Sequence, residues 1–177
     1  MNLHSFQKAK EFIEKDIGRE IALAKATAIP AGEQSLRELG IYPGGGNFLA
    51  ALGLLCYTEW AGKLKYGCKY PVRGRRGKEK DAASHNFNHF FDDLGPGYRR
   101  FREDEESEQE SPYSTFRCGL AHEYLVKKSC TIYMLGGGPV DAGIGKDSAG
   151  RYWFVVERYF SDLMRALDNV EAQLFPR

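Results

Sequence analysis

The segment 116–124 holds the residue types best suited to chemistry in this chain, namely Arg117, His122 and Tyr124. An arginine stays charged and can hold a phosphate through its planar guanidinium fork. A histidine titrates near neutral pH and can accept or donate the proton of a ribose 2′-hydroxyl. Cleavage of RNA through attack by that hydroxyl needs no metal ion. Arg117 and His122 therefore favour phosphodiester chemistry without a cofactor.

The positions of these residues on a helix determine whether their side chains can reach one common site. A Ser-Pro pair at 111–112 is typical of a helix start, and predicts a helix over about 112–126. On a regular α-helix, Arg117 and His122 would lie about 140° apart, whereas Arg117 and Tyr124 would share a face. A joint site for Arg117 and His122 is then easier to build where two copies of the helix meet across a two-fold axis.

The spacing Arg117-x4-His122 resembles the Arg-x4–6-His motif of the HEPN superfamily (higher eukaryotes and prokaryotes nucleotide-binding domains). With Tyr124 it is similar to the Arg-x4-His-x-Tyr form of HEPN toxins that are paired with minimal nucleotidyltransferases. The whole stretch, Arg-Cys-Gly-Leu-Ala-His-Glu-Tyr, is also typical of HEPN-like bacterial proteins. The resemblance covers eight residues.

This resemblance implies a helical bundle, a homodimer, and metal-independent endoribonuclease activity at the dimer interface of a toxin or phage-defence component. It implies RNA as substrate and a cognate antitoxin or nucleotidyltransferase as partner. Arg117 would hold the scissile phosphate, and His122 would transfer a proton or orient the 2′-hydroxyl. Tyr124 would line the site or receive nucleotides from a partner enzyme, and Cys118 and Glu123 are further candidates for its lining.

Two alternatives remain open from the residues. Many HEPN motifs carry Asn, Asp or another polar residue after the arginine, where this chain has Cys118, and a thiol is a poorer hydrogen-bonding group. This departure favours a non-catalytic module that dimerises and binds RNA or protein. In a purely structural interpretation, Arg117 pairs with a carboxylate, His122 is a hydrogen-bonded helix residue and Tyr124 packs in the core.

A basic stretch over 63–80 is a second candidate for contact with RNA. Its phosphate-binding candidates are Lys69, Arg73, Arg75, Arg76 and Lys78. Two tyrosines within the stretch, Tyr66 and Tyr70, could stack on bases. The alternative is a solvated loop that is neutralised by the acidic run 102–110.

His85 and His89 lie four residues apart on a predicted helix, with Asp92 and Asp93 one turn further on. This spacing can present two imidazoles and a carboxylate to a metal ion. Ordinary polarity of an exposed helix explains the same residues, and no metal is expected. Cys118 beside His122 also suggests a thiol nucleophile, but no oxyanion-hole motif accompanies it.

The apolar spacing predicts the elements that position these residues. It predicts a mainly α fold, an up-and-down bundle of four to five helices with a β-hairpin inserted before the last. The predicted helices are 3–28, 48–66, 84–94, 112–126 and 158–174, and the predicted hairpin strands are 130–135 and 151–156. Flexible loops are expected at about 67–82 and 102–111, and all of 1–177 is expected to form a single domain.

Composition narrows the class of protein. The chain has 177 residues and a net charge of +1, which gives no overall attraction to nucleic acid or membrane. The four cysteines show no metal-binding spacing and are expected to be reduced thiols in a cytoplasmic protein. We expect no signal peptide, and no apolar run approaches the roughly 20 residues of a membrane span.

Overall fold

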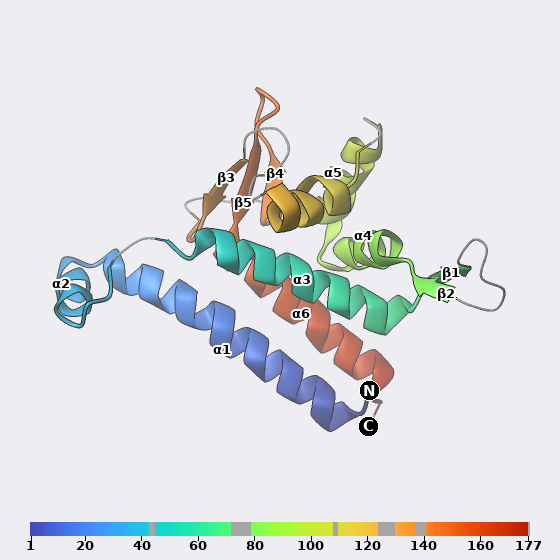
Figure 1. Cartoon of the computed structure of the whole chain (residues 1–177), viewed down its shortest axis with the longest axis horizontal. Coiled ribbons are helices and arrows are strands. Elements are labelled where there is room, and N and C mark those ends of the chain that lie inside the picture. Colours follow the sequence, from blue (N-terminus) through green and yellow to red (C-terminus); the bar gives the residue numbers. More distant parts are fainter. Residues whose placement is uncertain (43–44, 72–78, 108–109, 124–129, 137–140, 177) are drawn as a thin grey trace.

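A computed structural model of the chain describes residues 1–42, 45–71, 79–107, 110–123, 130–136 and 141–176 (Figure 1). At 79–80, 107 and 122–123 it describes the backbone alone. The described residues form six α-helices, one π-helix and five short strands. No helix among them is long and apolar enough to cross a membrane.

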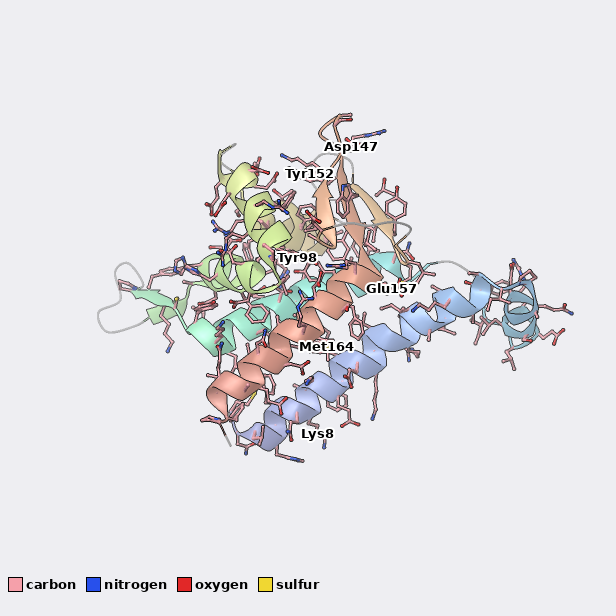
Figure 2. The ribbon with its side chains drawn as sticks, turned by 180° about the vertical axis from the view of Figure 1, so that it is seen from behind. Lys8, Tyr98, Asp147, Tyr152, Glu157 and Met164 are labelled. Carbon is pink, nitrogen blue, oxygen red and sulfur yellow. The ribbon has the colours of Figure 1, made fainter. Side chains whose placement is uncertain are left out.

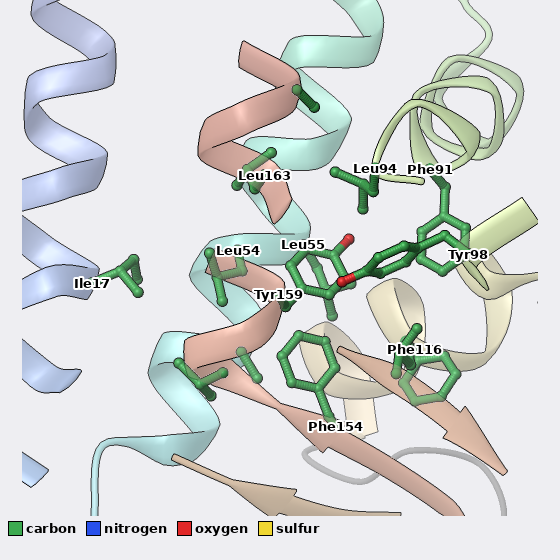
Figure 3. Close-up of a cluster of buried hydrophobic side chains, with 14 of the residues drawn as sticks. Ile17, Leu54, Leu55, Phe91, Leu94, Tyr98, Phe116, Phe154, Tyr159 and Leu163 are labelled. Atoms are coloured by element: carbon green, nitrogen blue, oxygen red, sulfur yellow. The ribbon is translucent and has the colours of Figure 1, made fainter. Parts of the chain in front are cut away.

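Three long helices form one side of the molecule: α1 (Leu3–Thr27), α3 (Asn47–Tyr66) and α6 (Val156–Leu174). They lie side by side in Figure 1, with α6 behind α3. Apolar residues at helical spacing bury one face of each helix, for example Ile17, Leu54 and Leu163, which are 0–5% exposed (Figure 3). The predicted helices 3–28, 48–66 and 158–174 are therefore confirmed to within two residues.

Helix α4 (Ala83–Asp93) packs on the face of α3 that points away from α1, and α5 (Pro96–Ser107) packs on α4 (Figure 1). Helix α4 agrees with the prediction, but the expectation of a flexible loop over 102–111 was wrong for residues 102–107, which belong to α5. The helix forms because Tyr98, Phe101 and Glu105 recur at helical spacing on one buried face. The acidic residues between them occupy its outer face.

A mixed sheet replaces the expected hairpin. Strands β3 (Cys130–Tyr133), β4 (Ile144–Lys146) and β5 (Tyr152–Val155) lie in the order β3-β5-β4. β3 pairs with β5 in parallel, and β4 pairs with β5 in antiparallel orientation. The prediction that 130–135 and 151–156 form a hairpin was therefore wrong, because the antiparallel partner of β5 comes from the glycine-rich connection between them.

Two segments for which no helix or strand was predicted are partly regular. Helix α2 (Pro30–Glu38) begins at Pro30. Proline fits the first turn of a helix because the N–H groups there have no partner within the helix, so that the lack of an N–H costs no hydrogen bond. The ends of the basic stretch pair as a hairpin, β1 (Lys69–Pro71) with β2 (Glu79–Asp81). The expected flexible loop 67–82 is thus partly ordered, and its residues 72–78 lie outside the described part of the chain.

The contact between α3 and α4 is so close that it requires a glycine. A Cβ added at Gly62 would lie 2.2 Å from the backbone oxygen of Asn86. We expect Gly62→Ala to lower the free energy of unfolding by about 1–3 kcal/mol, because the helices would have to move apart. Urea denaturation measures this value. The control is Gly18→Ala in α1, where the nearest atom is 4.0 Å away and a gain of about 0.5–1 kcal/mol is expected. Equal effects of the two variants would contradict this interpretation.

A buried ionic network joins α5 to the sheet. Glu105 is 0% exposed and forms an ion pair with Lys146 of β4, and it accepts a hydrogen bond of 2.8 Å from the hydroxyl of Tyr152 of β5 (Figure 2). The ammonium group of Lys146 also lies 5.1 Å from the centre of the Tyr152 ring. These contacts tie the sheet to the helical part of the fold.

Because of the same network, the free energy of unfolding is expected to fall at alkaline pH. Burial, together with the hydrogen bond to Glu105, raises the pKa of Tyr152 from 10.0 to about 12. The unfolded chain loses this proton near pH 10 and the folded chain near pH 12, so stability falls between these values, by about 2–3 kcal/mol. We expect Tyr152→Phe to remove this part of the pH dependence. Urea denaturation from pH 9 to 12 compares the variant with the wild type, and parallel curves would contradict the assignment.

Candidate functional site

The candidate site lies on the π-helix η1 (Tyr113–Glu123), drawn in yellow-orange above α3 in Figure 1. The predicted start at Ser111 is confirmed: the backbone N–H of Ser114 donates to Oγ of Ser111 at 3.2 Å, and the N–H of Ser111 donates to Oγ of Ser114 at 3.2 Å. Phe116 is fully buried in the core (Figure 3), and its ring centre lies 5.0 Å from that of Tyr152 and 6.0 Å from that of Phe101. This anchor fixes the helix and leaves its neighbour, Arg117, near the surface.

The π-helical winding changes the relation between positions 117 and 122. The described part of the helix expected over 112–126 is π-helical over 113–123, so the angle of about 140° was wrong, and residues 124–126 lie outside the described part of the chain. A π-helix closes hydrogen bonds between residues five apart, so these two positions lie about one turn apart, on nearly the same face. A second protomer is therefore not needed to bring the two positions to one side of the helix.

Arg117 is held from the neighbouring helix by a carboxylate. Its Nε donates a hydrogen bond of 2.7 Å to Oε2 of Glu59 in α3, and the two side chains are 22% and 27% exposed. Burial lowers the pKa of Arg117, but the hydrogen bond to Glu59 and nearby negative charge outweigh it, so the pKa is raised. Among the described residues, none accepts a hydrogen bond from its terminal nitrogens. Glu59 thus orients the guanidinium and leaves its outer edge available.

Three further side chains surround this ion pair: Cys56, Tyr113 and Cys118. Burial raises the pKa of the Cys56 thiol, and the charge of Arg117 only partly opposes this effect. Burial also raises the pKa of Tyr113, whose hydroxyl interacts with Cys118 and lies near Glu59. Cys56 and Tyr113 are therefore neutral near pH 7 and can serve as hydrogen-bonding groups, while Arg117 supplies positive charge.

The other predicted residues of the motif are only partly described. His122 and Glu123 lie in η1 by their backbone, and their side chains are outside the described part of the chain. Tyr124 lies outside the described residues altogether. Cys118 is half-buried beside Arg117, as a site-lining residue would be.

The basic stretch is described only at its ends. Lys69 lies in β1 and is exposed, which is compatible with a phosphate contact. The other four predicted phosphate-binding residues fall outside the described part: Arg73, Arg75, Arg76 and Lys78. The expected neutralisation by the acidic run is not seen for Glu105 and Glu106, which pair with Lys146 and Arg102.

The two histidines of α4 lie close together. Their Nε2 atoms are 2.9 Å apart, and both side chains are exposed. The carboxylates expected beside them are bound elsewhere: Asp92 pairs with Arg102, and Asp93 accepts hydrogen bonds from Lys65 and Tyr66. No group of three or more potential metal ligands occurs within the described residues.

The sequence analysis did not identify Glu59 as a site residue. The signal that was available is that Glu59 is the one charged residue in the otherwise apolar run 47–62. A carboxylate in such a run calls for a cationic partner, since a half-buried charge is costly when it is unpaired. No family model, curated protein or solved structure matches this chain, so the assignment of the site rests on its own residues.

Proposed function

We propose that this protein is a metal-independent endoribonuclease of HEPN type, acting in the cytoplasm as a toxin or phage-defence component. The observation that supports the proposal best is the state of Arg117. Its charge is fixed at the surface by one hydrogen bond to Glu59, and its terminal nitrogens have no acceptor among the described residues. A guanidinium in that state is suited to receive a phosphate through two parallel hydrogen bonds.

In the proposed reaction, the guanidinium of Arg117 binds the non-bridging oxygens of the scissile phosphate. His122 takes the proton of the ribose 2′-hydroxyl as the 2′-oxygen forms a bond to phosphorus. The bond from phosphorus to the 5′-oxygen breaks, and that oxygen takes a proton from solvent water, while His122 returns its proton to the solvent. The products are a 2′,3′-cyclic phosphate and a 5′-hydroxyl. The π-helix supports this arrangement because it brings positions 117 and 122 to nearly one face.

Incubation of RNA with the protein in excess EDTA tests this proposal. We expect fragments that end in a cyclic phosphate, which mass spectrometry identifies by its missing water relative to a linear phosphate. Loss of cleavage on His122→Ala in a folded protein would assign the proton transfer. Intact RNA after incubation with folded wild-type protein, over a set of structured and unstructured substrates, would contradict the enzymatic function.

We further propose a homodimer, with a surface on α1 and α3 as its contact. Phe12 is 54% exposed and lines a hollow of about 500 Å³ between the helices, together with Cys56 and Trp60. Leu49, in the first turn of α3, is 69% exposed. Exposed apolar side chains on two neighbouring helices suit a symmetric contact between two copies. Light scattering after size exclusion should give twice the mass of the chain, and Leu49→Glu should reduce it to one chain.

Glu59→Gln tests the role of the carboxylate that holds Arg117. The variant keeps the shape of the side chain but removes its charge, so the guanidinium is oriented less firmly. We expect the cleavage rate to fall about tenfold, as for the loss of a positioning contact. The matched control is Glu33→Gln, which loosens an exposed Arg37–Glu33 pair of 2.8 Å. Faster cleavage by Glu59→Gln would instead make Glu59 an inhibitory counter-ion of Arg117.

A non-catalytic module that binds RNA or a protein is the second candidate. Cys118 at the motif position after the arginine favours it, as does the pairing of Arg117 with Glu59, which a structural arginine would also make. A cognate antitoxin or nucleotidyltransferase is a proposed partner in either case. RNA retained on the protein without cleavage, and unchanged by His122→Ala, would support this second function over the first.

A further inference from the structure

We propose that His85 and His89 form a two-imidazole site for a divalent ion of the late first transition row, Cu²⁺ or Ni²⁺, on the outer face of α4. The site is independent of the proposed ribonuclease function. The two residues are four apart in an α-helix, which places them on one face, one turn apart. Both are exposed, so a hydrated ion can reach them.

The two Nε2 atoms lie close enough for both to bind one ion. They are 2.9 Å apart, a distance set by the hydrogen bond between the two rings. With metal–nitrogen bonds of about 2.0–2.1 Å, two ligands at a right angle lie about 2.9 Å apart, and two ligands at a tetrahedral angle lie about 3.3–3.4 Å apart. Both nitrogens can therefore reach one ion after a small movement of the side chains. Cu²⁺ and Ni²⁺ are favoured because imidazole is a good ligand for both, and because they stand high in the affinity order of the divalent first-row metals.

Metal binding requires one proton of the histidine pair to move to another nitrogen. At 2.9 Å one Nε2–H donates to the other Nε2, so one ring carries its proton on Nε2. The metal needs the lone pair of both Nε2 atoms, which requires that this proton move to Nδ1 of the same ring. The rings are 86° apart in plane and therefore have to turn as the ion enters. The ion then binds without net release of that proton.

Among the described residues, neighbouring groups contact one ring, and the nearby carboxylates are bound elsewhere. The ring of Tyr66 lies 5.3 Å from that of His89, and its hydroxyl donates a hydrogen bond of 2.8 Å to Asp93. Asp92 is bound by Arg102 in two hydrogen bonds of 2.7 and 2.8 Å. Lys65 also pairs with Asp93, and Arg99 lies 4.0 Å from Asp92.

Calorimetric titration of tag-free protein with Ni²⁺ at pH 7.5 tests the site, and EPR of the Cu²⁺ complex reports its ligands. We expect one ion bound with two imidazole nitrogens. His85→Gln and His89→Gln should each lower the affinity at least about tenfold, the loss of one of two protein ligands. His4→Gln is the matched control and should change nothing. All variants keep the four cysteines, so binding by thiols cancels in the comparison.

Three results would overturn the proposal: unchanged affinity in His85→Gln and His89→Gln, an equal loss in His4→Gln, or an EPR spectrum without nitrogen coupling. Circular dichroism of the variants verifies the fold, which exposed substitutions should leave intact. None of these measurements depends on RNA cleavage.

Discussion

Arg117→Ala is expected to lower the rate of RNA cleavage at least ~100-fold, because its guanidinium is the group proposed to bind the scissile phosphate. Removing one donor that stabilises developing negative charge costs about 10²–10³ in rate in other enzymes. The fold should survive, because Glu59 is partly exposed and water still reaches its carboxylate when Arg117 is removed, so the loss of stability should stay within about 1–3 kcal/mol. Initial rates on a labelled RNA measure the effect, and urea denaturation verifies the stability.

Two further variants make this test specific. Arg117→Lys keeps the charge but removes the planar fork, and we expect it to recover only a small part of the rate. Arg37→Ala is the matched control: it breaks another Arg–Glu pair of similar length, 2.8 Å, on the exposed helix α2. If Arg117→Ala cleaves RNA as fast as the wild type, or at the same rate as Arg37→Ala, the proposed role of Arg117 is wrong.

Lys146→Met is expected to lower the free energy of unfolding by about 3–5 kcal/mol, which is the largest effect on stability that we predict. The variant leaves the carboxylate of Glu105, which is 0% exposed, without its cation. Breaking a buried ion pair from one side costs about this much, because an uncompensated charge remains in the interior. Urea or thermal unfolding at pH 7 measures the loss.

Removing both charges separates this mechanism from a simple packing defect. The double variant Lys146→Met with Glu105→Leu should recover most of the stability, because no buried charge is left. Arg100→Met is the surface control: its pair with Asp141 is 65% and 82% exposed, and it should cost less than about 1 kcal/mol. A double variant as unstable as Lys146→Met alone would show that the loss arises from packing.

Local apolar spacing was enough to predict the long helices. The buried residues of α1 and α6 recur every three or four positions, and this pattern is complete within each segment. Helix α5 was missed because its acidic residues hid the spacing of Tyr98, Phe101 and Glu105. A buried glutamate reads as polar in the sequence, and only its partners Lys146 and Tyr152, some 40 residues later, make it a core residue.

The pairing of the strands was beyond the reach of local patterns. β3 and β5 were both recognised as strands, but the direction of their pairing depends on β4, a three-residue strand within a glycine-rich stretch. At the candidate site, residue types identified Arg117 and suggested that it pairs with a carboxylate. They did not identify Glu59, which lies 58 residues away, nor the π-helical winding of residues 113–123.

The winding of η1 has a consequence for the length of the motif. Arg117 and His122 are five residues apart, which is also the spacing of the hydrogen bonds in this π-helix. The number of residues between them therefore decides whether both lie on one face of the helix. Deleting Ala121 would let the helix tighten to α-helical winding, and the histidine would still follow the arginine by one turn. Inserting a residue there would carry the histidine away from that face. The segment thus tolerates the deletion of one residue between Arg117 and His122, but not the insertion of one.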